Sequence, residues 1–173
     1  HTRCSRDWSS DVCSSDLTDD GAAAFPRAMV VAPQREIDAV ASDSLRARAA
    51  YDTSTLRGLF AASAPRSYER SSEPDARVEL RTLGGHTPGS QATIVRGSEQ
   101  TLLFLGDLFM RPWQSNPRWV TAYDDEAWVS VDAKASIFAE AAAGGWLVAL
   151  SHEVATPLCR LFSDGERFRF VAE

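Results

Sequence analysis

Residues 77–90 read RVELRTLGGHTPGS, a run that alternates polar and apolar side chains and then stops at two glycines. Alternation of this kind predicts a half-buried strand over residues 77–83, because successive side chains of a strand point to opposite faces. The glycines predict the end of the strand. His86 therefore lies in the loop that follows it.

Two later segments repeat this arrangement. Residues 100–107 read QTLLFLGD and lead to Asp107, and residues 146–152 read WLVALSH and lead to His152. Layered α/β folds place their sites at strand ends, where loops vary while the sheet holds them rigidly. Each residue alone is more often a turn former or a satisfied polar group. Together, the three predict a shared metal site.

The rest of the chain alternates between strand and helix patterns. Hydrophobic periodicity and turn residues predict strands at 28–32, 91–96, 100–105, 158–162 and 167–171, and helices at 33–50, 53–62 and 125–143. In the last helix Ala127, Val131, Ala135 and Phe138 form the apolar stripe. The mixture predicts a layered α/β domain in which helices cover sheets.

Composition narrows the class of protein. A chain of 173 residues with 44% hydrophobic residues predicts one soluble globular domain. A net charge of −6 without a basic face excludes nucleic acid as a partner. No apolar run approaches the roughly 20 residues of a membrane span, so we expect no membrane association and a cytoplasmic location. The three cysteines, an odd number, favour reduced thiols.

Residues 1–17 differ from everything after them. They are rich in Ser, Asp, Cys and Trp, lack hydrophobic periodicity, and resemble translated sequencing-adapter read-through. We therefore expect a non-native or disordered leader, followed by a truncated domain over residues 18–173. A metal site made by His1, Cys4 and Cys13 is disfavoured, because their spacing matches no usual zinc pattern. The chain begins at His1 rather than Met, so we expect sequence to be missing upstream.

The motifs His86-Thr87-Pro88-Gly89-Ser90, Gly106-Asp107 and Ser151-His152, in this order, resemble the second half of the metallo-β-lactamase superfamily. The resemblance covers nearly everything after residue 17. It implies an αβ/βα sandwich with mixed, largely antiparallel sheets and two metal ions at the edge between them. By this resemblance His86 and His152 each bind one metal and Asp107, the catalytic residue, bridges them.

The resemblance also implies the chemistry. Imidazole and carboxylate ligands suit zinc, with iron or manganese as alternatives. The metals would activate a water to attack an ester, lactone or similar bond in a small-molecule substrate. The oligomeric state stays open.

The first-half motif of the superfamily, H-x-H-x-D-H, is absent from the sequence. Without it each metal keeps one histidine and a shared Asp107, whereas a catalytic zinc normally has three protein ligands. We therefore expect the chain as written to bind metal weakly and to be inactive.

Residues 109–119 look most similar to the branch that holds quorum-quenching lactonases and organophosphate-ester hydrolases. On this basis Met110, Trp113 and Trp119 are candidate substrate-binding residues, with ordinary loop packing as the alternative. Met110 stands where the lactonase branch often has Tyr. Asp124 and Lys134 resemble a structural pair of the family with Lys in place of Arg, and we expect a helix-surface ion pair.

Two alternatives remain. Two histidines and one carboxylate are also the ligand set of non-haem iron enzymes, and some members of the superfamily are mono-iron sulfur dioxygenases. The second alternative is a non-catalytic remnant. Iron content and oxygen uptake would distinguish the first, and an upstream H-x-H-x-D-H motif would exclude the second.

Overall fold

The structure, a computed structural model, describes residues 25–173 except 26, 43 and 166. The expected leader at residues 1–17 therefore lies outside the described residues, as do Cys4 and Cys13. The chain divides into two compact units, one formed by residues up to Ala32 with Ile37–Ser67, the other by Pro33–Glu36 with Tyr68–Glu173. No helix in the described part of the chain is long and apolar enough to cross a membrane.

The smaller unit is mainly helical. The elements in this part of the chain are β1 (Val31–Pro33), α1 (Gln34–Ala41), α2 (Leu45–Ala50), α3 (Thr53–Ser63) and β2 (Arg66–Tyr68), with β1 and β2 paired. Pro33, the first turn of α1 and Tyr68 belong to the larger unit. The prediction of one helix over residues 33–50 was wrong. The Ser44 side chain accepts a hydrogen bond from Ala47 N and so begins a new helix, and Pro33 ends β1 instead of opening α1.

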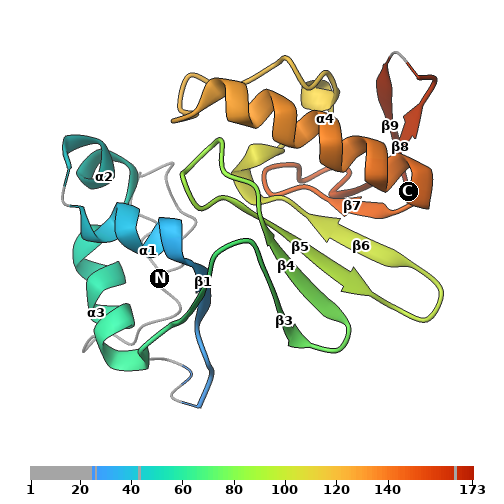
Figure 1. The fold of residues 1–173 in the computed structure, drawn as a ribbon. Helices are drawn as coiled ribbons and strands as arrows, with labels where there is room; N and C mark the ends of the chain where they lie inside the picture. Colours follow the sequence, from blue (N-terminus) through green and yellow to red (C-terminus); the bar gives the residue numbers. More distant parts are fainter. Residues whose placement is uncertain (1–24, 26, 43, 166) are drawn as a thin grey trace. The chain divides into compact units, whose positions relative to one another are not determined.

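The larger unit is built on a seven-stranded sheet with the strand order β3-β4-β5-β6-β7-β8-β9 (Figure 1). The strands are β3 (Ser71–Asp75), β4 (Val78–Thr82), β5 (Gln91–Arg96), β6 (Thr101–Phe104), β7 (Leu147–Ala149), β8 (Leu158–Ser163) and β9 (Phe168–Ala172). Every neighbouring pair is antiparallel except β6 and β7. The expected mixed, largely antiparallel sheet is confirmed.

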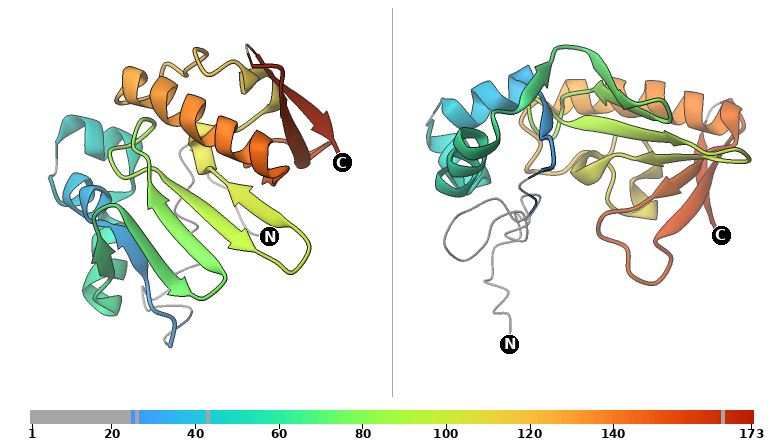
Figure 2. Two further views of the ribbon diagram at one scale, coloured as in Figure 1. Left: turned by 45° about the vertical axis from the view of Figure 1, so that its right-hand side comes forward. Right: turned by 90° about the horizontal axis from the view of Figure 1, so that it is seen from below.

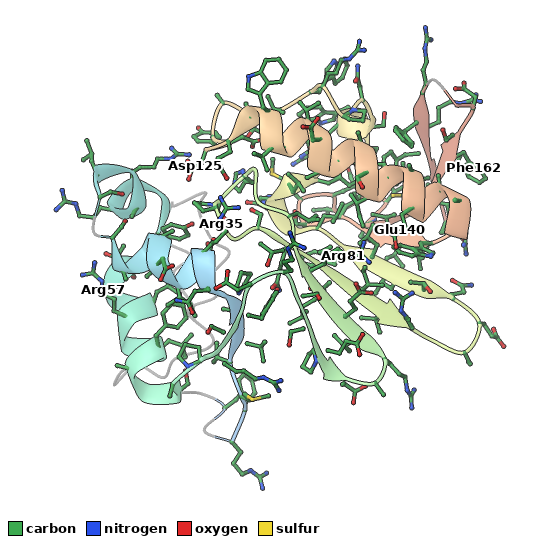
Figure 3. The ribbon with its side chains drawn as sticks, viewed as in Figure 1. Arg35, Arg57, Arg81, Asp125, Glu140 and Phe162 are labelled. Carbon is green, nitrogen blue, oxygen red and sulfur yellow. The ribbon has the colours of Figure 1, made fainter. Side chains whose placement is uncertain are left out.

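One helix, α4 (Ala127–Gly144), joins β6 to β7 and lies along one face of the sheet (Figures 1 and 2). Ile94, Leu103 and Val148 are fully buried in the core on this face. Phe138 of α4 packs edge-to-face on Phe109, with ring centroids 4.9 Å apart. Arg81 of β4 binds Glu140 of α4 at 2.6 Å, and Figure 3 labels both. The sheet and α4 therefore share one core.

The apolar stripe predicted for this helix was right for Phe138 and wrong for Ala127 and Ala135. Ala127 and Ala135 are exposed. The buried side holds Ser130, Lys134, Ile137, Phe138 and Ala141. An alanine-rich helix gives little contrast between its faces, so the sequence could not fix which side packs inward.

The opposite face of the sheet is apolar as well. Strand register places Phe104, Ala149 and Leu158 side by side across β6, β7 and β8. Phe104 is 40% exposed and Leu158 is 39% exposed. In the described structure the main core cluster therefore lies beneath α4, whereas this row on the opposite face is partly exposed.

Substitutions at two adjacent residues of β6, Leu103 and Phe104, compare the contributions of the two faces of the sheet to stability. We expect Leu103→Ala to lower the free energy of unfolding by about 2–5 kcal/mol, because it leaves a cavity beneath α4. Phe104→Ala should cost about 1 kcal/mol or less, because much of this side chain is already in contact with water. Urea unfolding of both variants measures the difference. Equal losses would mean that the second face is also covered.

Candidate metal centre

The directions of the strands explain why the three predicted residues meet. Strands β4 and β6 are both antiparallel to β5, and β7 is parallel to β6. The carboxyl ends of β4, β6 and β7 therefore lie at the same edge of the sheet. His86 follows β4, Asp107 lies in the 3-10 turn Gly106–Leu108 after β6, and His152 follows β7.

The carboxylate of Asp107 stands between the two imidazoles. His152 Nε2 lies 2.9 Å from its Oδ1, and His86 Nε2 lies 3.8 Å from its Oδ2. The Asp107 side chain is almost fully buried, and both histidines are partly buried. The structure thus brings together the three residues that the sequence singled out.

Asp124 fixes the orientation of the His86 ring. Its Oδ1 lies 3.0 Å from His86 Nδ1 and accepts a hydrogen bond of 2.6 Å from the Thr121 hydroxyl. Burial raises the pKa of Asp124, but the hydrogen bonds from His86 and Thr121 outweigh it and hold this pKa below its usual value. An ionised carboxylate can only accept hydrogen bonds. His86 Nδ1 therefore donates its proton, and Nε2 is left facing Asp107.

The buried Ser130 hydroxyl of α4 also lies near Asp124. It has no partner in full hydrogen-bond geometry, yet it is close enough to favour the ionised carboxylate. The same serine contacts the His86 loop, because a Cβ added to Gly85 would lie 2.5 Å from its oxygen. Gly85 also has φ +101°, a conformation that only glycine adopts readily. The loop before His86 is thereby held close to α4.

Ser151 ties the His152 loop to Asp107. Its hydroxyl donates to Gly106 O at 3.0 Å and lies 3.2 Å from Asp107 Oδ1. His152 N donates to Met110 O at 3.3 Å. The sequence showed Ser151 only as the neighbour of His152, and its position beside Asp107 gave no local signal.

The candidate substrate residues lie on the segment after Asp107. The Trp113 and Trp119 rings are 6.4 Å apart, and these side chains are 56% and 53% exposed. Gln114 of the same segment, which sequence reasoning missed, is buried. Its Oε1 accepts hydrogen bonds from the backbone of Met110 and Arg111. The segment is therefore anchored from inside and leaves two indoles exposed.

Lys134 does not form the expected surface ion pair. It is fully buried, and its Nζ donates to the Trp119 carbonyl oxygen. Burial lowers its pKa, and the charge of Asp124 opposes this shift. In the described residues no salt bridge links these two side chains within 4.0 Å. Lys134 instead anchors the segment that carries Trp119.

The donors fit a metal site in kind. Imidazole nitrogen and carboxylate oxygen bind zinc at about 2.0–2.2 Å, so two ligands of one ion lie no more than ~4.2 Å apart. The 2.9 Å and 3.8 Å separations satisfy this limit. As the side chains stand, no group of three or more His, Cys, Asp or Glu within residues 25–173, as far as they are described, is arranged to hold an ion. The described residues thus offer donor atoms of the kind that binds zinc, but too few of them are arranged around one point.

The chain is similar in fold to solved structures of other proteins. Neither a protein-family model nor a curated protein matches the sequence. Among solved structures, a probable metal-dependent hydrolase from Staphylococcus aureus is similar over 91% of this chain, with 21% identity and a TM-score of 0.76. The dizinc quorum-quenching lactonase AidC gives 17% identity, 91% coverage and a TM-score of 0.75.

The hydrolase AbOPH, of the β-lactamase superfamily, is similar over 91% of the chain, with 21% identity and a TM-score of 0.72. The chain spans only 57%, 59% and 59% of the lengths of these three proteins. In fold, the chain is similar to these three hydrolases, among them AbOPH of the β-lactamase superfamily.

Proposed function

We propose that this chain is part of a metal-dependent hydrolase in which Asp107 bridges two ions, one bound by His86 and the other by His152. The observation that carries the proposal is the placement of one imidazole Nε2 beside each oxygen of a single buried carboxylate. A bridging carboxylate offsets the charge of two dications held close together. Zinc suits this donor set, with iron or manganese as alternatives.

The residues around the three donors support this role. Asp124 holds the His86 ring with Nδ1 protonated, so that Nε2 points its lone pair toward Asp107, where a cation would bind. Ser151 steadies Asp107 and the loop of His152. A metal bound here would supply Lewis acidity and would make water nucleophilic near neutral pH. The chain's own contribution is to fix three donors at one sheet edge.

The substrate we propose is a small ester or lactone with an apolar part. Trp113, Trp119 and Met110 offer apolar contact area beside His152, and aromatic side chains lose little rotamer freedom on binding. The likeness in fold to AidC, solved in complex with a homoserine product, supports this class. A loop that only packs on the protein is the alternative for these residues.

The same donor set limits what the isolated chain can do. Only two histidines, His86 and His152, lie outside residues 1–17, and no H-x-H-x-D-H motif is present. We propose that a working centre takes its remaining ligands from groups outside these 173 residues. The mono-iron alternative rests on the fact that two histidines and one carboxylate also form the ligand set of non-haem iron enzymes.

Metal titration of the 173-residue chain tests the proposal. Zn²⁺ should bind with a dissociation constant far above the nanomolar range, because each ion would have fewer than the three protein ligands of a usual catalytic zinc. His86→Ala, Asp107→Ala and His152→Ala should each weaken binding further, whereas Asp75→Ala, away from the three residues, should not. Isothermal calorimetry measures the dissociation constant of each variant.

Nanomolar zinc affinity, or turnover of a simple ester, would show that the donors present are sufficient and that the proposed incompleteness is wrong. Zinc binding unaffected by all three substitutions would exclude the site itself. Preferential binding of Fe²⁺ with oxygen uptake would favour the dioxygenase alternative over a hydrolase.

The role given to Asp124 predicts a pH dependence of stability. Its pKa in the folded chain lies below the ordinary value of 3.8, so its ionised form stabilises the fold at any pH above about 4. Asp124→Asn should lower the free energy of unfolding by about 1–3 kcal/mol at pH 7. The difference from the unchanged chain should shrink as pH falls through the folded pKa, because Asp124 is then protonated too. Urea unfolding between pH 7 and pH 3 measures it, and a constant difference would contradict the argument.

A further inference from the structure

The first turn of α1 reaches the loop that carries His86. Glu36 Oε2 accepts a hydrogen bond of 2.8 Å from the Thr87 hydroxyl and another of 2.8 Å from Gly89 N. Glu36 lies in the same compact unit as these residues. The carboxylate thus binds a side chain and a backbone group within three residues of the candidate metal ligand, although it is 51 residues away in sequence from Thr87.

The contact between Gly89 and Glu36 leaves no space for a larger side chain at position 89. A Cβ added to Gly89 would lie 2.6 Å from the Glu36 backbone nitrogen, so only glycine fits against the start of α1. The loop is also closed on itself, because Thr87 N donates to Ser90 Oγ at 2.8 Å and Ser90 N donates to Thr87 O at 3.2 Å. A closed loop moves as one piece, and Glu36 fixes that piece to a helix.

A second contact of the same turn lies on the other side of His86. Arg35 Nη2 pairs with Glu126 Oε2 at 3.2 Å, and Figure 3 shows Arg35 near the loop that carries Asp125. Glu126 N in turn donates to Gly85 O at 2.9 Å. Both side chains of the ion pair are exposed, so it contributes little. The half-buried Glu36 carries most of the restraint, because its Oε2 accepts two hydrogen bonds of 2.8 Å from the loop itself.

We propose that Glu36 is a positioning residue for His86: its carboxylate clamps the Thr87–Ser90 loop so that the His86 ring is held toward Asp107. The proposal rests on the proposed metal site and adds a residue from a distant segment to it. Glu36 acts through two hydrogen bonds accepted by one oxygen. Its negative charge is not itself required, because a neutral amide oxygen can accept the same two bonds.

The experiment is a Zn²⁺ titration of the full chain, followed through the side-chain NMR signals of His86 and His152. Glu36→Ala should weaken binding about tenfold, the scale seen when groups that orient a ligand are removed. It should shift the His86 ring signals before any metal is added and leave those of His152 in place. Glu36→Gln should bind zinc as the unchanged chain does. Glu99→Ala, an exposed glutamate in the β5–β6 turn, is the matched control.

Thr87→Val removes one of the two hydrogen bonds and should fall between the unchanged chain and Glu36→Ala. Unfolding midpoints of all variants show whether each is folded under the conditions of the titration. Unchanged affinity in folded Glu36→Ala, or equal losses in Glu36→Ala and Glu36→Gln, would overturn the positioning role. If Zn²⁺ moves neither histidine in the unchanged chain, the proposed function fails instead, and the two failures are thereby distinguished.

Discussion

The candidate centre depends on one feature of the sheet, the common direction of β4, β6 and β7. Because these three strands end at the same edge, their following loops place His86 and His152 on the two oxygens of Asp107. The parallel pair β6 and β7 is the only one in the described sheet, and it requires the long crossover through α4. The helix that closes the core is therefore also the element that brings the second and third donors together.

Local sequence patterns predicted most of this framework. The strands β4 to β9 and the helix α4 were found within a few residues, because alternation, helical periodicity and glycine stops are properties of neighbouring residues. His86, Asp107 and His152 were found because each follows a strand. The contacts that support them were not found, since Glu36, Gln114 and Ser151 act on groups that only the folded chain brings near. The inward side of α4 was misplaced because the helix is rich in alanine and two of its buried residues, Ser130 and Lys134, are polar.

The two faces of the described seven-stranded sheet are covered differently. The sheet is covered by α4 on one face, while Phe104, Ala149 and Leu158 form an apolar row on the other. Sheets of this kind normally bury both apolar faces between layers. The chain matches 57–59% of the length of its structural neighbours.

Lys134 is a basic side chain buried in the core, where its charged form is disfavoured. Burial lowers the pKa of this lysine, so its charged form destabilises the fold, and an apolar side chain of similar volume would pack there more cheaply. Its ammonium group holds the Trp119 carbonyl, and its charge balances Asp124, which in turn orients His86. Buried charged groups with shifted pKa values cluster where function requires them. Lys134 thus holds the segment that carries Trp119, and Asp124, whose charge acts on Lys134, holds the His86 ring.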